Sequence, residues 1–177
     1  MYTLNQIIFE IDSDGHCLYR SLADQLNVNL INPFSKQLLE RANAELSEKN
    51  KRELKSMTSA NGLFTYLHLR SLVANQLRRK CDDYFPFVMD VCETMDQYAN
   101  TVESSSEWGG QVEIQAFLDL CGDQYNLKIV QDNGIVSMGS NAKSSLPNAS
   151  TLIVSYHKRY YALGEHYNSV KLQTKQD

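Results

Sequence analysis

The stretch Asp12-Ser13-Asp14-Gly15-His16-Cys17-Leu18-Tyr19-Arg20 places a cysteine between a predicted turn and a predicted helix. Asp-Gly is typical of a tight turn, and the apolar spacing after Cys17 predicts a helix over residues 17–27. The sulfur would then lie at a helix N-terminus, where unpaired N–H groups favour negative charge. Because a thiol attacks as the thiolate, Cys17 is a candidate nucleophile.

A second informative run, Glu165-His166-Tyr167-Asn168-Ser169-Val170, lies near the far end of the chain. His166 can accept the proton of a thiol. Asn168 lies on the same side of an extended segment, where it can orient the histidine ring. A large separation in sequence is expected when the fold brings a base to a nucleophile. Asp14 is the other candidate for orienting the ring, although the turn before Cys17 also requires it.

Three blocks resemble, in the same order, the signature motifs of the OTU (ovarian tumour) cysteine proteases: Asp14-Gly15-His16-Cys17-Leu18-Tyr19-Arg20, Trp108-Gly109-Gly110-Gln111-Val112-Glu113 and His166-Tyr167-Asn168-Ser169-Val170. The resemblance extends over residues 5–172 and looks closest to eukaryotic cytosolic members. It implies a deubiquitinase in which the Cys17 thiolate attacks the carbonyl of the last glycine of ubiquitin, in an isopeptide bond to lysine. His166 would accept and return the proton, and neither a metal nor an organic cofactor would be needed.

The resemblance also implies a narrow channel for the tail of ubiquitin, which ends in two glycines. We expect this channel to be lined by Gly15, His16, Trp108, Gly109, Gly110 and Tyr167. His16 departs from the family pattern, which usually has Asn beside the nucleophile. A structural interpretation of Trp108-Gly109-Gly110 competes and is favoured: the glycines would adopt positive φ in a turn, and the indole would fill the core.

Two alternative functions are compatible with this family pattern. A ubiquitin-binding module without turnover would keep the fold and lose a member of the site, whereas nucleophile, base and orienting residue are all present here. A thiol peptidase that acts on a ubiquitin-like modifier would keep all of them, and the sequence does not separate it from a deubiquitinase. His157 is the alternative candidate for the catalytic base. The other cysteines are interpreted as small buried hydrophobic residues: Cys81, Cys92 and Cys121.

Composition favours an ordinary globular domain. The chain has 177 residues, of which 42% are hydrophobic, and this predicts a single domain over residues 1–177. Its net charge of −4 argues against nucleic acid as the main partner. No apolar stretch reaches the roughly 18 residues of a membrane span, and the N-terminal residues lack the pattern of a signal peptide. No zinc-like spacing of Cys and His occurs, so we expect reduced thiols in a cytoplasmic protein, with a nuclear location also open. We also expect the chain to be a monomer.

Helical periodicity dominates the first part of the chain. After a short extended segment at residues 7–11, we expect helices at 17–27, at 35–57 with Ser35 as N-cap, at 63–82, at 88–98 and at 112–120. Asn61-Gly62 and Phe85-Pro86-Phe87 supply breaks between them, and residues 101–107 are expected to form a polar loop. His68 falls within one of these helices and is interpreted as structural or exposed.

The period then changes to that of strands. Residues 127–131 and 135–138 flank Asp132-Asn133-Gly134, which predicts a hairpin. Residues 151–156 follow a polar loop at 139–150 and are too apolar for a half-exposed strand, so we expect them to be central in the sheet. Short strands at 160–163 and 167–172 flank the histidine. We therefore predict an α+β domain with the site where helices and sheet meet, and the OTU resemblance implies a small twisted sheet between helical layers.

Overall fold

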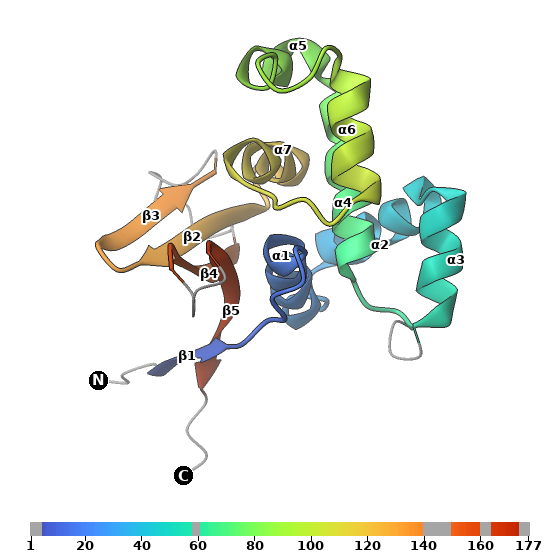
Figure 1. Cartoon of the computed structure of the whole chain (residues 1–177). Coiled ribbons are helices and arrows are strands. Elements are labelled where there is room, and N and C mark those ends of the chain that lie inside the picture. The colour runs from blue at the N-terminus through green and yellow to red at the C-terminus, as the bar shows by residue number, and fades with distance from the viewer. Residues whose placement is uncertain (1–4, 58–60, 140–149, 160–163, 174–177) are drawn as a thin grey trace.

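The computed structural model describes residues 5–57, 61–139, 150–159 and 164–173. In this part of the chain, five strands form one sheet with the order β1-β5-β4-β2-β3 (Figure 1). The strands are β1 (Asn5–Phe9), β2 (Tyr125–Gln131), β3 (Gly134–Met138), β4 (Ser150–His157) and β5 (His166–Gln173). The first strand therefore pairs with the last, and α1 (Cys17–Val28) follows β1 after a short loop.

The strand β4 lies at the centre of the sheet, as its apolar sequence predicts. It pairs in parallel with β2 and antiparallel with β5, and its residues Leu152 and Val154 are completely buried. The predicted hairpin is present, with Leu127 of β2 opposite Met138 of β3. The strand expected at residues 160–163 lies outside the described residues, as does most of the loop expected before β4.

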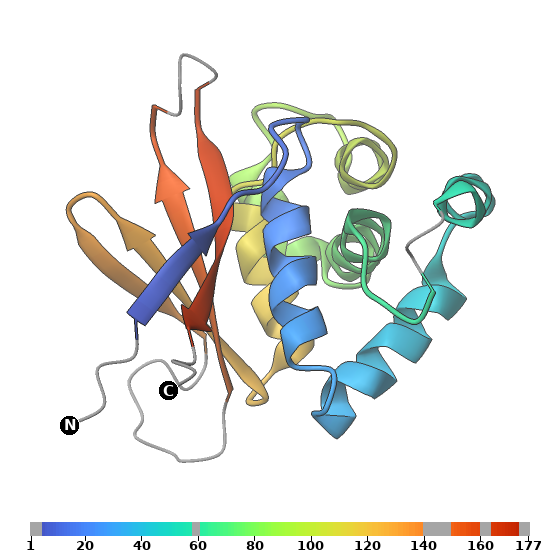
Figure 2. The same cartoon turned by 90° about the horizontal axis from the view of Figure 1, so that it is seen from below.

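All the described helices lie on one face of the sheet (Figure 2). The helices α1 and α7 (Gln111–Cys121) lie next to the sheet, and α4 (Tyr66–Arg79) lies behind them. Side chains from each of the three helices are buried in the core, among them Leu22, Leu69 and Phe117. The other helices are α2 (Pro33–Glu45), α3 (Glu48–Ser56), α5 (Cys81–Tyr84), the 3₁₀ helix η1 (Phe85–Phe87) and α6 (Met95–Ser104). The α+β class is confirmed, but the described sheet does not lie between helical layers, because both layers pack on the same face.

The single helix expected over residues 35–57 is wrong, because two helices occupy this region. The side chain of Asn32 caps α2 by accepting a hydrogen bond from a backbone N–H two residues on, at 2.9 Å, and Pro33 occupies the first helical position. Ser35, the expected N-cap, is instead buried inside α2, where its hydroxyl lies 2.6 Å from the hydroxyl of Tyr125. The helix α2 therefore starts before Ser35, the residue that was expected to cap it.

Polar caps set two further helix boundaries that differ from the prediction. Ser47 starts α3 by accepting a hydrogen bond at 3.2 Å from a backbone N–H three residues on, and this divides α2 from α3. Thr94 and Gln97 form a reciprocal capping box, with the Gln97 N–H 3.2 Å from Thr94 Oγ1. The helix expected at 88–98 is therefore wrong in its start, and α6 continues through residues 101–104 of the expected polar loop.

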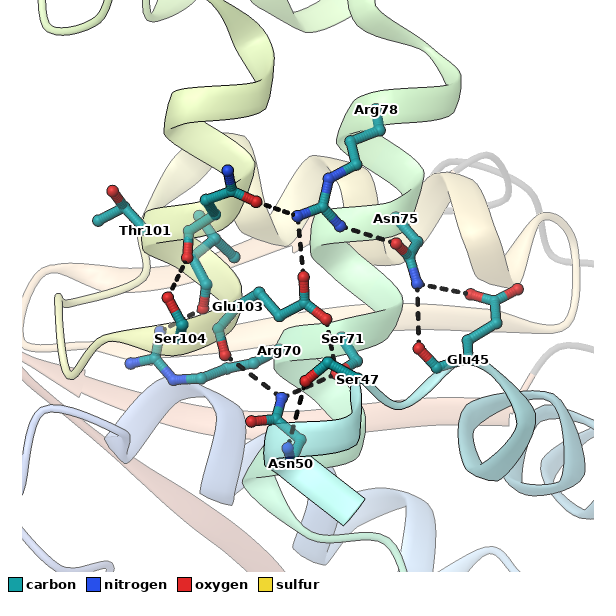
Figure 3. Close-up of polar contacts among 12 residues, drawn as sticks. Glu45, Ser47, Asn50, Arg70, Ser71, Asn75, Arg78, Thr101, Glu103 and Ser104 are labelled. Atoms are coloured by element: carbon teal, nitrogen blue, oxygen red, sulfur yellow. Dashed lines mark hydrogen bonds and ion pairs between the residues drawn. The ribbon is translucent and has the colours of Figure 1, made fainter. Parts of the chain in front are cut away.

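A network of polar side chains ties α4 to α6 and to the junction of α2 with α3 (Figure 3). Arg78 of α4 donates to the Glu103 carboxylate of α6 at 2.8 Å, and Asn75 donates to the last carbonyl of α2 at 3.4 Å. Asn50 of α3 is buried and donates to Ser71 Oγ of α4 at 3.0 Å. These bonds hold α2, α3 and α6 against α4. The same helix carries Arg70, which belongs to the candidate site.

His68 fixes the start of α4, and it is buried. Its Nδ1 accepts a hydrogen bond from the Thr65 N–H at 3.0 Å, and its Nε2 lies 3.3 Å from Asn43 Oδ1. Because Thr65 is the cap, α4 starts after it rather than at residue 63. Burial lowers the pKa of His68 to about 4, so the ring stays neutral in the folded protein.

We expect the free energy of unfolding to decrease as the pH falls from 6.5 to about 4, because the unfolded chain protonates His68 and the folded chain does not. The contribution of His68 to this loss should be roughly 2–3 kcal/mol between about pH 7 and about pH 4.5. His68→Gln keeps an acceptor for the Thr65 N–H and removes the titration. Urea unfolding of both proteins at the two pH values measures the difference. An equal pH dependence in both would contradict this account of His68.

Candidate active site

Cys17 is the first residue of α1 and is buried, with 6% of its surface exposed. Backbone N–H groups of Tyr167 and Leu18 are directed at its sulfur, so the N-terminus of α1 and the start of β5 meet at the thiol. Burial raises the pKa of the Cys17 thiol, and the bonds from Tyr167 and Leu18 oppose this rise only in part. The thiol is therefore protonated at neutral pH unless a base takes its proton.

His166 and Asn168 are the first and third residues of β5, and both are buried. His166 Nε2 lies 3.0 Å from Asn168 Oδ1, as expected for two residues on one side of a strand. The same oxygen accepts a hydrogen bond from the Ile11 N–H at 2.8 Å, so the amide oxygen rather than its nitrogen faces the ring. Nε2 must then donate, and in the neutral imidazole Nδ1 is the basic nitrogen.

Asp14 is held by its own turn and by Arg20. The Arg20 Nε donates to both carboxylate oxygens, at 3.2 Å and 3.0 Å, and the His16 N–H donates to Oδ1 at 3.1 Å. Burial alone would raise the pKa of Asp14, but the bonds from Arg20 and His16 outweigh it and bring that pKa below its ordinary value. Asp14 is therefore a charged residue that stabilises the turn before α1, whereas Asn168 contacts the histidine ring.

Arg70 of α4 is a residue of this site that the sequence did not reveal. It is 1% exposed, and its guanidinium donates to the carbonyls of Gly15 at 3.1 Å, Glu107 at 2.7 Å and Val102 at 2.7 Å. Gly15 belongs to the loop before α1 and Glu107 to the loop before α7, so one buried side chain joins the two loops. Its signal in the sequence is a single arginine among the leucines of Leu67-His68-Leu69-Arg70-Ser71-Leu72.

The loop before α1 has little freedom at Gly15 and His16. Gly15 has a φ of +83°, and a Cβ built there would overlap the carbonyl of Ser106, so only glycine fits. The His16 ring stacks on Tyr66 with ring centroids 4.2 Å apart, and its Nδ1 accepts from Arg70 Nε at 2.9 Å. Burial and the charge of Arg70 lower the pKa of His16, so the ring is neutral with its proton on Nε2.

The favoured interpretation of Trp108-Gly109-Gly110 as a turn with a buried indole is wrong. Trp108 is 54% exposed, and its ring lies over Gly164, where an added Cβ would be 2.7 Å from it. Gly109 and Gly110 do not have positive φ. Gly109 instead allows the chain to approach α1 closely, since a Cβ there would lie 2.7 Å from Leu18 Cδ2. Trp108 thus covers the segment that leads into β5.

Two other residues singled out in the sequence also lie near the start of β5. Tyr167 contributes its backbone to the thiol site, and its ring packs on Tyr156 with centroids 5.0 Å apart. His157, the rival base, lies opposite His166 in the register of β4 and β5. Its Nε2 is 3.1 Å from Ser155 Oγ of its own strand. The His166 ring contacts an amide oxygen, and this contact fixes its tautomer.

The described residues contain no group of three or more His, Cys, Asp or Glu side chains placed as metal ligands would be. Nor does any helix in the described ranges combine the length and the apolar character needed to span a bilayer. All four cysteines are free thiols: Cys121 is buried as predicted, whereas Cys81 and Cys92 are half-buried.

The sequence is similar to one protein family over most of its length. A family model described as OTU-like cysteine protease matches residues 12–167. Among curated proteins, deubiquitinase OTUD6B of Gallus gallus is 29% identical over 175 residues, and OTU domain-containing protein 2 of Saccharomyces cerevisiae is 30% identical over 171 residues. These alignments cover 94% and 92% of this chain but 45% and 44% of the two relatives, so the chain spans less than half of their length.

Solved structures with low sequence identity share the fold. An OTU domain in complex with ubiquitin has a TM-score of 0.59 at 14% identity, over 94% of this chain and 70% of that chain. The OTU domain of OTUD1 has a TM-score of 0.57 at 15% identity, over 94% of this chain and 85% of that chain. At such identities the likeness concerns the fold alone.

Replacing Arg70 by lysine should strongly destabilise the protein, because the three N–H groups of one ammonium nitrogen cannot reproduce the four hydrogen bonds that the guanidinium makes through three nitrogens. We expect the free energy of unfolding to decrease by about 3 kcal/mol, as for a disrupted network around a buried charge. Arg78→Lys is the matched control on the same helix, where the side chain is 26% exposed, and it should cost less than about 1 kcal/mol. Urea unfolding measures both values. An equal loss in the two variants would contradict the role given to Arg70.

Proposed function

We propose that this chain, which belongs to the OTU-like cysteine proteases, is a deubiquitinase that hydrolyses isopeptide bonds after the C-terminal glycine of ubiquitin. Two findings support ubiquitin as the substrate: a curated relative that covers nearly the whole chain is named deubiquitinase OTUD6B, and a solved OTU domain of the same fold is in complex with ubiquitin. The observation that carries the reaction type is the meeting of Cys17 with the start of β5, where Asn168 contacts the His166 ring.

The proposed reaction is acyl transfer through a thioester. His166 Nδ1 takes the proton of the Cys17 thiol, and the thiolate attacks the carbonyl carbon of the glycine. The C–N bond of the isopeptide breaks, and the leaving lysine amine takes the proton from Nδ1. Water then attacks the thioester with His166 as base, which releases ubiquitin and returns the proton to the sulfur. Because burial raises the pKa of Cys17, transfer of the proton to His166 is the step that creates the nucleophile.

Asn168 is the proposed orienting residue. Its amide oxygen is held by the Ile11 N–H and accepts from His166 Nε2, which keeps the ring proton away from Nδ1. Asp14 is less suited to this role because its carboxylate is paired with Arg20. Its turn shapes the oxyanion hole instead, where the Cys17 N–H at the start of α1 would donate to the developing oxyanion. One such donor is typically worth about 3 kcal/mol.

The tail of ubiquitin would pass beside Trp108 to reach the sulfur. Gly109 holds this segment close to α1, and Gly164 leaves room for the indole to lie across the approach to β5. A channel with a bulky wall of this kind suits residues without side chains, such as the two glycines that end ubiquitin. We propose that it is lined by Gly15, His16, Trp108, Gly109, Gly110 and Tyr167.

The proposed partners are ubiquitin and ubiquitinated proteins, with the chain acting as a monomer in the cytoplasm. The net charge of −4 supports a protein rather than nucleic acid as the main partner. A binding module without turnover is less well supported, because candidate nucleophile, base and orienting residue lie at one site. An enzyme for a ubiquitin-like modifier would use the same residues, so the choice of substrate needs a direct measurement.

A ubiquitin that carries an electrophile at its C-terminus should label Cys17 and spare the other cysteines, because Cys17 alone is proposed to lie beside a base. Peptide mapping by mass spectrometry identifies the labelled residue. Cys17→Ala should abolish labelling, and Cys92→Ala, the matched control, should label at the wild-type rate. Labelling that persists in Cys17→Ala would contradict the assignment of Cys17 as the nucleophile. Faster labelling by a matching probe built on a ubiquitin-like protein would identify that protein, rather than ubiquitin, as the preferred substrate.

Four variants separate Asn168 from Asp14 as the orienting residue. Asn168→Ala should lower kcat roughly 100-fold, because the base loses its fixed tautomer, whereas Asn168→Asp should keep most activity because a carboxylate accepts the same two N–H groups. Asp14→Asn should lower kcat only mildly, and Asp14→Ala should lower the melting temperature through its turn. The measurements are kcat and thermal melts for all four. A fully active Asn168→Ala enzyme of wild-type stability would give the orienting role to Asp14.

A further inference from the structure

The loop between β1 and α1 acts on both nitrogens of the His166 ring. The Ile11 N–H holds Asn168 Oδ1 at 2.8 Å, and this oxygen lies 3.0 Å from Nε2. Two residues further along the same loop, Ser13 Oγ lies 3.3 Å from Nδ1. One side of the ring is therefore held through Asn168 and the other by a direct contact, which the mechanism proposed above does not use.

The direction of the hydrogen bond between Ser13 and His166 follows from the groups on the far side of the ring. Asn168 Oδ1 can only accept, so Nε2 carries the ring proton. A neutral imidazole has a single N–H, which leaves Nδ1 as an acceptor and the Ser13 hydroxyl as its donor. The reversed amide would set its NH₂ group against the Ile11 N–H. Asn168 Nδ2 has no hydrogen-bond partner among the described residues, so the oxygen alone anchors this amide.

We propose that Ser13 is a positioning residue that holds the His166 ring in place for proton transfer at Nδ1. The proposal rests on the cysteine–histidine mechanism given above. Ser13 is exposed, so its hydroxyl has room to turn toward water and let the Cys17 S–H take its place at Nδ1. When the S–H bond breaks and the Nδ1–H bond forms, the Ser13 oxygen accepts from the new N–H. It gives up this bond when the proton passes to the leaving amine.

A hydroxyl suits this position because it donates to the neutral ring and accepts from the charged one. Asn168 restrains the ring at Nε2, and Ser13 adds a restraint at Nδ1, the nitrogen that takes the proton. Small displacements of a reacting group lower rates steeply. One hydrogen bond of ordinary strength corresponds to about fivefold in rate. The effect of Ser13 should therefore be smaller than that of Asn168.

Ser13→Ala should lower kcat about fivefold and leave KM unchanged, because the hydroxyl acts on the base and not on ubiquitin. Ser13→Thr keeps the hydroxyl and should restore most of kcat, which a general disturbance of the loop would not allow. Asp12→Asn changes an exposed neighbour in the same loop and should leave both constants at wild-type values. A kcat for Ser13→Ala at or above that of the wild type, or an equally low kcat for Ser13→Thr, would overturn the proposal.

A measurement without turnover separates this proposal from the choice of substrate. Nitrogen-15 NMR of the histidine rings should show His166 with its proton on Nε2 in the wild type and in Ser13→Thr. The Nδ1 signal should move or broaden in Ser13→Ala and stay unchanged in Asp12→Asn. An unchanged Nδ1 signal in Ser13→Ala would overturn the role of Ser13 even in an enzyme that cleaves ubiquitin. If the wild type does not cleave ubiquitin and the signal still moves, the substrate proposal fails and the contact of Ser13 with the base stands.

Discussion

The buried guanidinium of Arg70 constrains the whole site. An unpaired charge at this depth would cost several kcal/mol, and Arg70 is satisfied by the carbonyls of Gly15, Val102 and Glu107 and by the ring of His16. Arg70 of α4 therefore positions the loop before α1 and the loop before α7 relative to each other. Arg78 on the same helix bonds to Glu103 and holds α6 alongside. The helices α4 and α6 thus set the geometry of both loops without supplying a reacting atom.

The candidate base, in contrast, is positioned by strand pairing. Residues two apart in β5 share a side, which brings Asn168 to the ring of His166. The N–H of Ile11, where the chain has just left β1, fixes which end of the amide faces that ring. The tautomer of the histidine therefore depends on the register between β1 and β5. An asparagine is sufficient here because the group has only to accept hydrogen bonds.

Features that depend on local spacing could be predicted from the sequence. The helix that starts at Cys17, the central strand β4 and the contact of His166 with Asn168 all follow from periods of a few residues. Arg70 could not be found in this way, because three of its hydrogen-bond partners are backbone carbonyls, which leave no mark on residue type, and the fourth, the His16 ring, lies 54 residues away in the sequence. The position of Trp108 was missed because it depends on Gly164, which only the folded chain brings beneath the indole. The starts of α3 and α6 were missed because the caps Ser47 and Thr94 outweigh an apolar period that runs on past them.

The pairing of β1 with β5 has a consequence for the order of events during folding. These strands are the first and last elements of the described chain, so nearly all of the described residues must close into one loop before they meet, and contacts of such long range form slowly. Until β5 is in place, the Tyr167 backbone does not reach Cys17 and the proposed base, His166, is not held by its strand. A chain still being synthesised, or one that has lost its last strand, carries the sulfur without the groups proposed to activate it. The proposed chemistry is thereby tied to the completion of folding.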